Sequence, residues 1–593
     1  MIEQERLYLN DKLIELATET SQFSRTLQVN DLVSLDNRQT NFTKNIKIPK
    51  TPKNVLTMDF LGVVGNNSNL PYQKNNIKYF IGNEAIIYNG WGVITETNAF
   101  YNLTVYDGNL DLYKSIENKT LADLSLTAIT HTKTLATVVN SFTANLPYKY
   151  ILADYNGKAI YNTVSGGTTA STINIDYLVP SVKVSYLWDN IFSQYGFTYE
   201  GSIFSNIDFT NLYLTYPKSI PADLGKTQIY DYSTSGLTAN SGLTVTAGTF
   251  TATEQITIDF TIFDSLTYVA EQPNFYYLIV PTKNGVGIDS GIITLNSGDV
   301  LAATVITFGE GYISGGSYGI DKIYKYNSAN IEFGENLSGF IIKDFINEIL
   351  QRFGLSIFKD KYTNNYKFKT LAEITNDSAS IDWTSKFQSV DSEKYIYGSY
   401  AQKNILKYKY NDENANYNDG AILVNNKNID DTKTIIQSKI YSPEANTSNI
   451  FGFNTNVYKI WNKEVKDTGV VTYKDLENRF HFIRSYDKNL STGTTIGSEI
   501  LLTNQNISVA PAETFSRLSF QEIVANYYPD ISKLLNKSKI IIANINLKYT
   551  DISDFDFTKL YFIKQLGGYY LVNKILNFQI GYTTKVEMIR VNK

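Results

Sequence analysis

Residues able to perform acid–base or metal chemistry are scarce in this chain. It has 593 residues, no cysteine and two histidines, His131 and His481. A Ser-His-Asp triad or a histidine-based metal site needs partners at suitable positions, and neither histidine belongs to an HxH, HExxH or HxxxH pattern. The lack of cysteine excludes thiolate nucleophiles, zinc-thiolate sites and disulfides. We therefore expect both histidines to be structural or surface residues.

Carboxylates are common, and one cluster stands out. The segment DISDFDF contains Asp551, Asp554 and Asp556. A glycosidase needs two carboxylates roughly 5 Å or 6.5–9.5 Å apart across a sugar. Alternation predicts that Asp554 and Asp556 share one face of a strand, but the same pattern is typical of a solvated strand or turn, which we favour over catalysis.

An oxygen-rich segment, DENANYNDG, begins at Asp412 and places Asn414 and Asn416 at alternate positions. A calcium-binding EF-hand loop needs glycine at its sixth position and a bidentate glutamate at its twelfth. Tyr417 and Leu423 stand at those positions. We expect the polar tip of a hairpin, and a cation site of another type stays open.

Two segments could contact phosphate or nucleic acid. The glycine-rich GEGYISGGSYG at 309–319 lacks the GK[ST] ending of a phosphate-binding loop, which favours a flexible turn. The segment TKNIKIPKTPKN at 43–54 could contact nucleic acid, but lysine and proline also protect exposed strand edges, so edge protection or a subunit contact is favoured. Its basic and proline residues are Lys44, Lys47, Lys50, Lys53, Pro49 and Pro52.

These observations predict no catalytic, cofactor-binding or metal-binding residue, no cofactor and no enzyme activity. The formal net charge of −5 is small for this length, so it does not favour binding to nucleic acid or membranes. The start of the chain, MIEQERLYLNDKLIEL, lacks the basic and apolar regions of a secretory leader, and we expect none. The most apolar segment, KIIIANINLKY at 539–549, has the length of a strand, so no membrane-spanning segment is expected.

The elements that must position these residues are mainly β-strands. Tyr and Phe number 45 and 32, and aromatic and β-branched residues favour pleated, half-buried surfaces. Asn10-Asp11, Asn89-Gly90 and Asp107-Gly108 are turn signals between β-rich runs. Together they predict a small antiparallel barrel or sandwich in the first 110 residues.

Two helices interrupt the strands and resemble each other. LWDNIFSQYGF at 187–197 and FINEILQRFGL at 345–355 lie in predicted helices at 181–195 and 340–353, and a glycine follows each one. The apolar residues recur at helical spacing, which places them on one face. The two sets are Val184, Leu187, Trp188, Ile191, Phe192 and Tyr195, and then Ile342, Phe345, Ile346, Ile349, Leu350 and Phe353. Two unrelated core helices would also fit, but we favour duplication of a whole unit.

The domain organisation follows from this repeat. Residues 231–335 are rich in Thr, Ser and Gly with short apolar alternations, which predicts an inserted β-sandwich. We expect a first barrel domain at 1–230 and a second at 336–593. The last strands, in KLYFIKQLGGYYLVNKILNFQIGYTTKVEMIRV, repeat the strand–turn–strand pattern of EAIIYNGWGVITETNAFYNLTVYDG in the first half.

The order of these elements resembles the tail-hub, or baseplate hub, proteins of tailed bacteriophages, and most of all those of phages that infect Bacteroidetes. The similar segments are RLYLNDKLIEL, NDLVSLDNRQTNFTKNIKIPKTPKN, IDWTSKF, YAQKNILKYKY and LGGYYLVNKI. The resemblance implies two similar hub-type barrels in one chain, each with a docked helix. It also implies a trimer in which six barrels match a sixfold tail tube to a threefold structure below.

The resemblance further implies a location in the virion tail after synthesis in the host cytoplasm. The expected partners are the tail tube protein above, distal baseplate, spike or fibre proteins below, and DNA only in transit through the channel. The alternative is a receptor- or glycan-binding tail adhesin, favoured by the tyrosine content and the sandwich. A polysaccharide depolymerase is a third class, but it lacks an identifiable pair of carboxylates.

Overall fold

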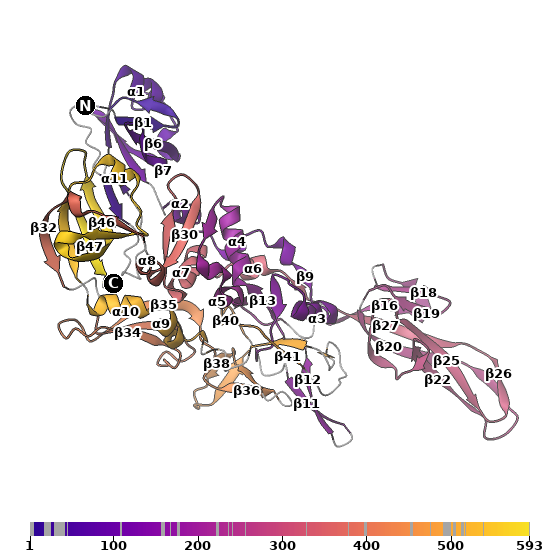
Figure 1. The fold of residues 1–593 in the computed structure, drawn as a ribbon. Helices are drawn as coiled ribbons and strands as arrows, with labels where there is room; N and C mark the ends of the chain where they lie inside the picture. The colour runs from indigo at the N-terminus through magenta and orange to yellow at the C-terminus, as the bar shows by residue number, and fades with distance from the viewer. Residues whose placement is uncertain are drawn as a thin grey trace.

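The computed structural model describes residues 5–591 with several gaps, and Figure 1 shows an elongated molecule. Strands from the two ends of the chain lie together at one end, and the insert projects at the other. The gaps are 17–24, 29–41, 44–45, 107–109, 156–159, 166–167, 175–177, 221–224, 235, 240, 255, 328, 378, 396–399, 451–454, 475, 490–499, 502–505, 511–514, 516 and 538.

The N-terminal strands form an antiparallel unit with the sheet order β5-β8-β7-β6, and β1 pairs with the outer side of β6. In the sequence, a short helix, α1, separates β5 from β6. The hairpin from β1 to β2 turns at Asn10 and Asp11, both with positive φ, so this sequence prediction is confirmed. The bounds are β1 Glu5–Leu9, β2 Lys12–Ile14, β5 Ile46–Pro49, α1 Pro52–Thr57, β6 Asn75–Ile81, β7 Glu84–Thr97 and β8 Phe100–Tyr106.

The C-terminal strands form a unit with the same connectivity. Its sheet order is β44-β47-β46-β45, again antiparallel, and a short helix, α11, again separates the first strand from the second along the chain. Gly82 and Gly567 occupy equivalent turns and both have positive φ. The bounds are β44 Ile540–Ile545, α11 Tyr549–Ser553, β45 Leu560–Ile563, β46 Gly568–Phe578 and β47 Thr584–Val591. The strands therefore repeat, but the counterparts of β45, β46 and β47 are β6, β7 and β8, so the repeat begins one strand earlier than the sequence pattern placed it.

Both units belong to one 14-stranded sheet. Its main path is β2-β1-β6-β7-β8-β4-β3-β46-β47-β44-β32, so β4 and β3 join the two units by backbone pairing. Most buried apolar side chains of the two units form one continuous cluster that runs from Leu7 to Met588, and five from the C-terminal unit belong to a second cluster: Ile540, Leu560, Leu571, Ile589 and Val591. The additional bounds are β3 Arg25–Gln28, β4 Phe42–Thr43, β31 Ser380–Asp382 and β32 Phe387–Lys394.

Asn89-Gly90 is not a turn, which corrects the sequence prediction. Both residues lie inside the continuous strand β7, where Gly90 pairs with Ile77 of β6. A Cβ on Gly90 would lie 3.1 Å from the carbonyl oxygen of Tyr106 on β8. The glycine therefore permits a close approach of two strands. The predicted turn at Asp107-Gly108 lies outside the described residues.

The two similar helices have the same length and the same ends. α4 (Val184–Gln194) and α7 (Ile342–Arg352) each have 11 residues, and Gly196 and Gly354 follow them with φ values of 75° and 59°. Their apolar faces are buried in one shared cluster, which also includes buried residues of the C-terminal unit such as Leu560 and Leu571. The two helices therefore share a core with each other, and the docking of one helix on each barrel stays a prediction.

The strands that follow these helices also meet. β14 (Thr198–Glu200) pairs in parallel with β30 (Asn365–Thr370), while β29 (Leu355–Lys359) pairs with β30 in the antiparallel sense. The aromatic rings of Trp188 and Phe192 on α4 pack against Phe368 of β30. The remaining helices and central strands surround this core: α2 Leu110–Ser115, α3 Leu135–Thr143, α5 Ile207–Thr210, α6 Phe333–Asn336, α8 Leu371–Thr375, α9 Phe520–Tyr527, α10 Pro529–Asn536, β9 His131–Thr132, β10 Tyr148–Tyr150, β13 Pro180–Lys183, β15 Tyr213–Thr215, β33 Lys403–Lys409, β34 Gly420–Leu423, β35 Thr432–Tyr441 and β40 Phe482–Ile483.

The insert is a sandwich of two five-stranded sheets with its own core. The sheet orders are β17-β16-β27-β20-β24 and β18-β19-β25-β22-β23, and a hairpin of β21 and β26 extends beyond them. The bounds are β16 Lys226–Asp231, β17 Gly236–Leu237, β18 Leu243–Thr246, β19 Thr249–Ala252, β20 Ile256–Asp264, β21 Thr267–Ala270, β22 Tyr276–Lys283, β23 Val286–Gly287, β24 Gly291–Leu295, β25 Val300–Phe308, β26 Gly311–Gly315 and β27 Tyr318–Tyr326. The mainly β fold class is confirmed. Within the described residues, no helix is long and apolar enough to cross a membrane.

The glycines after the two helices give a matched test of the shared core. A Cβ on Gly354 would lie 2.9 Å from the carbonyl oxygen of Tyr527, whereas a Cβ on Gly196 would meet nothing within 4 Å. Gly196→Ala should lower the free energy of unfolding of this core by about 1 kcal/mol, the cost of a left-handed alanine. Gly354→Ala should cost clearly more, because the carbonyl must also move. Urea unfolding of both variants measures the difference, and equal losses would contradict the role of the close contact.

Candidate functional site: the sheet edges and the polar junction behind them

The two ends of the 14-stranded sheet are the first candidate site. Along the main path, β2 and β32 each have one neighbour among the described strands. Edge strands expose backbone donors and acceptors that can pair with another chain. Leu13 on β2 is 38% exposed and Val390 on β32 is 39% exposed. Both edges therefore combine backbone pairing capacity with an exposed apolar side chain.

The edge strand β32 is shaped by bulges and ion pairs. Its pairing with β44 shifts register twice, between Phe387 and Ser389 and between Val390 and Ser392. Its acidic residues are held by lysines of the same unit, at 2.9 Å from Lys585 to Asp391 and 2.9 Å from Lys539 to Glu393. These contacts fix the strand on its own sheet and leave its other side open.

The lysine- and proline-rich segment lies along the first unit. Lys47 and Lys50 are exposed near β5, and the Lys50 ammonium lies 5.3 Å from the centre of the Tyr101 ring. Pro52 begins α1, where it needs no amide donor. Lys53 is exposed on α1, Pro49 ends β5, and Lys44 lies outside the described residues.

A buried asparagine, Asn54, joins this segment to the chain that follows β2. The Asn54 side chain donates to the carbonyl oxygens of Glu15 and Pro49 at 2.8 and 2.9 Å, and accepts from the Glu15 amide at 2.9 Å. Asn54 is fully buried. It therefore ties the chain after β2 to the end of β5, although no strand pairing joins them.

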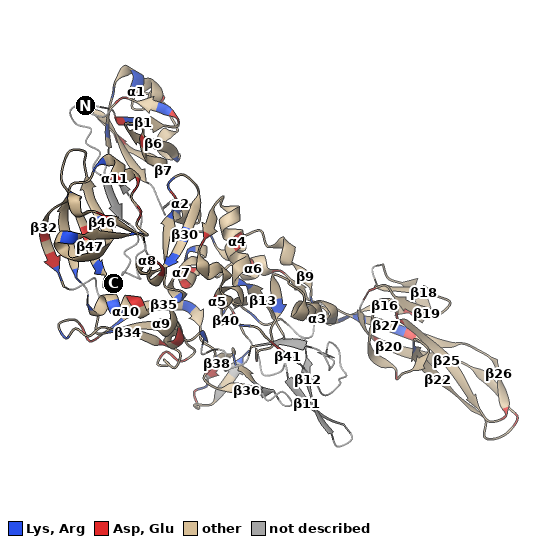
Figure 2. Ribbon diagram, viewed as in Figure 1, with Lys and Arg blue, Asp and Glu red and all other residues tan. Residues whose placement is uncertain are grey.

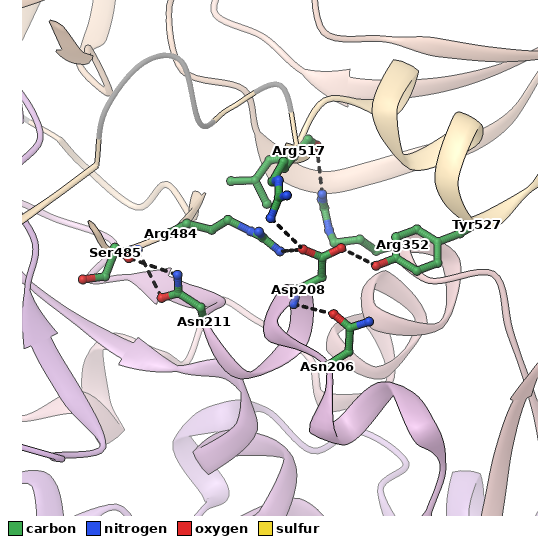
Figure 3. A network of polar contacts seen from close by, with 9 residues as sticks. Asn206, Asp208, Asn211, Arg352, Arg484, Ser485, Arg517 and Tyr527 are labelled. Atoms are coloured by element: carbon green, nitrogen blue, oxygen red, sulfur yellow. Dashed lines mark hydrogen bonds and ion pairs between the residues drawn. The ribbon is translucent and has the colours of Figure 1, made fainter. Parts of the chain in front are cut away.

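A polar junction links the two halves of the chain behind the sheet (Figure 3). At its centre, Asp208 on α5 accepts hydrogen bonds from the Arg484 guanidinium and from the Tyr527 hydroxyl. Arg517 adds a weaker contact, with 3.8 Å between its Nη1 and Asp208 Oδ1. Arg484 follows β40 and Tyr527 ends α9, so residues distant in the sequence converge on one carboxylate.

Local geometry positions Asp208 for this role. Asn206 is the N-cap of α5, and its side-chain oxygen accepts from the Asp208 amide at 2.8 Å. Asn211, just after the helix, donates to the Ser485 carbonyl at 3.0 Å and accepts from the Ser485 amide at 3.3 Å. These two hydrogen bonds hold the backbone of Ser485, the residue after Arg484, next to the end of α5.

The electrostatics favour the charged form of Asp208. Partial burial alone would raise the pKa of its carboxyl, but the hydrogen bonds from Tyr527 and Arg484 and the charges of Arg484 and Arg517 outweigh it. The result is a pKa below the ordinary value. Arg484 is only 1% exposed, so this carboxylate supplies the counter-charge that a buried guanidinium requires.

A second buried arginine stands beside this junction on α7. Arg352 donates to the Tyr408 hydroxyl at 2.9 Å and to the Leu518 carbonyl at 3.1 Å. Its guanidinium also lies 4.9 Å from the centre of the Phe482 ring. One turn earlier, the buried Glu348 accepts from the Ser438 hydroxyl at 2.9 Å. Both arginines therefore connect distant segments inside the protein.

The two histidines lie next to residues of the central core. His131 stacks on Tyr148 with 4.1 Å between ring centres, and its Nε2 lies 2.8 Å from the Tyr150 hydroxyl. Burial lowers the pKa of His131. His481 is buried, and burial together with the charge of Arg479 lowers its pKa to about 3. Within the part of the chain that the structure describes, neither ring hydrogen-bonds a serine or a carboxylate.

Of the two forms expected for the carboxylate cluster, a solvated strand or a turn, the structure shows a turn preceded by a helix. Asp551 lies in α11, where it accepts from the Lys548 amide at 2.8 Å and pairs with Lys386. Asp554 is the C-cap of the same helix, and Asp556 accepts from the Thr558 amide at 2.7 Å in the next turn. A helix and a turn replace the strand because Asp551 can cap the first turn.

Of the other two candidate segments, only the oxygen-rich one is a turn. The glycine-rich segment, expected to be a flexible turn, is mostly strand, because Gly311–Gly315 forms β26 and Tyr318 begins β27. Asp412 accepts from the Asn414 amide at 3.0 Å in the connection between β33 and β34, which is the expected polar hairpin tip. In the glycine-rich segment, Gly309, Gly311 and Gly316 have positive φ and pass close to other backbone. Among the described residues, no group of three or more His, Asp or Glu side chains is placed to hold a metal ion.

A cavity of about 600 Å³ lies between α8, α10 and the end of β47. Its lining includes Leu371, Leu534, Lys533, Lys537 and Arg590. None of the residues singled out in the sequence lines this cavity.

The sequence did not predict the Asp208 junction, although the small number of arginines pointed to where buried ion pairs could lie. Only eight of the 53 basic residues are arginines, and Arg352, Arg484 and Arg517 all lie at or beside the junction. Arginine suits buried ion pairs because its planar guanidinium donates in fixed directions. The partners themselves could not be found, since they are hundreds of residues apart.

The junction predicts a large cost for removing its carboxylate charge. Asp208→Asn keeps the size of the side chain but leaves Arg484 buried without a counter-charge, so the free energy of unfolding at neutral pH should fall by about 3 kcal/mol. Asp189→Asn, at an exposed carboxylate on α4 that accepts from Tyr199, is the matched control and should cost below about 1 kcal/mol. Urea unfolding measures both, and similar losses would contradict the account.

The same carboxylate predicts a dependence on pH. Because the pKa of Asp208 is lowered in the folded protein, its stabilisation is present above the unfolded pKa of about 3.9 and is lost as the pH falls through the lower, folded value. The stability difference between the wild type and Asp208→Asn should therefore shrink below about pH 4. A difference that stays constant from neutral pH into that range would show that the charge of Asp208 does not contribute.

Comparisons with known proteins give structural similarity but no family. No protein-family model matches the sequence, and no curated protein matches it. A crystal structure of the 43 kDa tail protein of prophage MuSo2 from Shewanella oneidensis is similar over 100% of this chain and 97% of that chain, with 7% sequence identity and a TM-score of 0.32.

Proposed function

We propose that this chain is a structural hub subunit of a phage tail, which closes the distal end of the tail tube as a ring. The observation that carries the proposal is the repeated unit: β5-β8-β7-β6 and β44-β47-β46-β45 have the same order, the same pairing sense and a helix at the same point. One chain thus offers two similar building blocks. Three chains would offer six, which adapts sixfold to threefold symmetry.

The free edges supply a physical route to ring closure. In a head-to-tail contact, β2 of one copy would face β32 of the next, and the contact would repeat until the ring closes. Pairing would satisfy backbone groups that the isolated chain leaves to water. Leu13 and Val390 would be covered at each contact.

The ring would act mechanically. The tail tube protein would bind above, distal spike or fibre components below, and DNA would pass through the channel without being held. The small net charge of −5 suits passage better than binding. The junction at Asp208 would keep the central core rigid beneath the sheet.

A receptor- or glycan-binding adhesin is the second candidate, and one observation favours it. Tyr268, Tyr276 and Tyr312 on the projecting insert are each at least 50% exposed. Exposed aromatic rings are typical of binding surfaces. This function would use the insert alone and requires no ring.

Charge variants at the two edges test the ring. Leu13→Lys or Val390→Lys places a lysine on an edge strand, which opposes pairing with another strand. We expect the wild type to form a trimer and each variant alone to be monomeric, since every head-to-tail contact then contains one altered edge. Val286→Lys, at an exposed valine on the insert, is the matched control and should stay trimeric.

A mixture of the two edge variants makes the test specific. The intact β2 edge of Val390→Lys can meet the intact β32 edge of Leu13→Lys once, so an equal mixture should form heterodimers and no ring. Native mass spectrometry measures each species. A monomeric wild type, or a mixture that stays monomeric while the wild type forms rings, would contradict the proposed contact.

A further inference from the structure

The distal part of the insert presents an uncovered apolar face on one sheet. Tyr276 and Leu278 on β22 pair with Phe308 and Ile306 on β25 without a register shift, so the four side chains lie on one side. Their exposed fractions range from 39% to 53%. The rings of Tyr276 and Phe308 stack with 4.7 Å between centres. We call these four residues the distal face.

The distal face points away from the core of the insert. Leu301 on β25 is fully buried in that core, and its side chain alternates with those of Ile306 and Phe308. On the core side, the hairpin of β21 and β26 covers the sheet, with Tyr268 5.6 Å from Tyr277. One side of the distal strands is therefore packed, and the other exposes large apolar side chains.

Two carboxylates stand at the tip beside the distal face. Glu310 follows Phe308 after a turn at Gly309, and its carbonyl oxygen accepts from the Glu271 amide at 3.0 Å. Both side chains are exposed, and within the described residues neither forms an ion pair. Figure 2 shows acidic colour and no basic colour at this tip. Like charges held close together are relieved by a cation from outside.

The lysines of the insert are already engaged elsewhere. The ion pairs are Lys226–Asp259, Lys283–Asp299, Lys322–Asp231 and Lys325–Glu254. None of these lysines belongs to the distal face or the tip. The surface is thus apolar in the middle and acidic at its border.

We infer that the distal face docks another protein component of the same particle, one that presents an apolar patch bordered by lysine or arginine. Apolar surface patches with a charged rim are typical of protein interfaces, and aromatic residues are enriched at interface centres. A second copy of this chain fits poorly, because it would bring Glu271 and Glu310 toward another pair of carboxylates. A basic partner would complement them. This inference rests on the proposed function, since it names the chemistry of a distal partner.

Photo-crosslinking in the full-length chain tests this docking. Tyr276→p-benzoylphenylalanine is expressed in cells that assemble the particle and then irradiated. We expect one adduct with a different particle component, whose crosslinked peptide contains lysine or arginine. The adduct should decrease at least tenfold when Glu271→Lys and Glu310→Lys are added, and also when Leu278→Ser and Ile306→Ser are added. Asp289→Lys, in the connection between β23 and β24, is the matched charge control and should leave the adduct unchanged.

Several results would overturn the inference. An adduct with a second copy, or no adduct in assembled particles, would contradict it. An adduct that persists with Glu271→Lys and Glu310→Lys would contradict the basic rim of the partner. Binding of the full chain to a glycan array through the distal face would also contradict it. Thermal unfolding of each variant checks that the insert stays folded. The oligomer mass is measured on the same protein, so failure of this docking with an intact ring is distinct from failure of the ring itself.

Discussion

Backbone pairing between the two ends of the chain is the constraint on which the rest of the structure depends. β3 pairs with β46 and β4 pairs with β8, so strands from the first hundred residues and the last fifty share one sheet. A sheet requires its strands in register, and buried faces fix that register. The chain between the two end units must therefore leave the sheet and return to it.

The central core stabilises this connecting part of the chain. α4 and α7 pack in one cluster, and their following strands meet on β30. Asp208 then joins α5 to the segments that carry Arg484 and Tyr527. Because a buried guanidinium is costly without its carboxylate, this junction favours one arrangement of the two halves over alternatives. The insert stands outside this network with a core of its own, which leaves its distal face free for a partner.

Sequence patterns predicted the local elements well and the distant contacts poorly. The helical spacing from Val184 and from Ile342 located both helices, since periodicity is a property of neighbouring residues. Asn10-Asp11 forms the expected turn. Asn89-Gly90 does not, because Gly90 lies within β7 and lets β8 approach closely. Asp551 lies in the first turn of a helix instead of a strand. The sequence alone does not distinguish a carboxylate that caps a helix from one on a strand. The partners of Asp208 and the joining of two barrels through β3 and β4 depend on contacts between distant residues, which no local pattern encodes.

Electron microscopy of the purified full-length protein, viewed along the axis of its oligomer, tests the central claim most directly. The account predicts a threefold particle of three 67.0 kDa chains in which six similar barrel-sized densities surround a channel. A particle without threefold symmetry, or a threefold particle with only three such densities around its channel, would contradict the use of one chain as two building blocks.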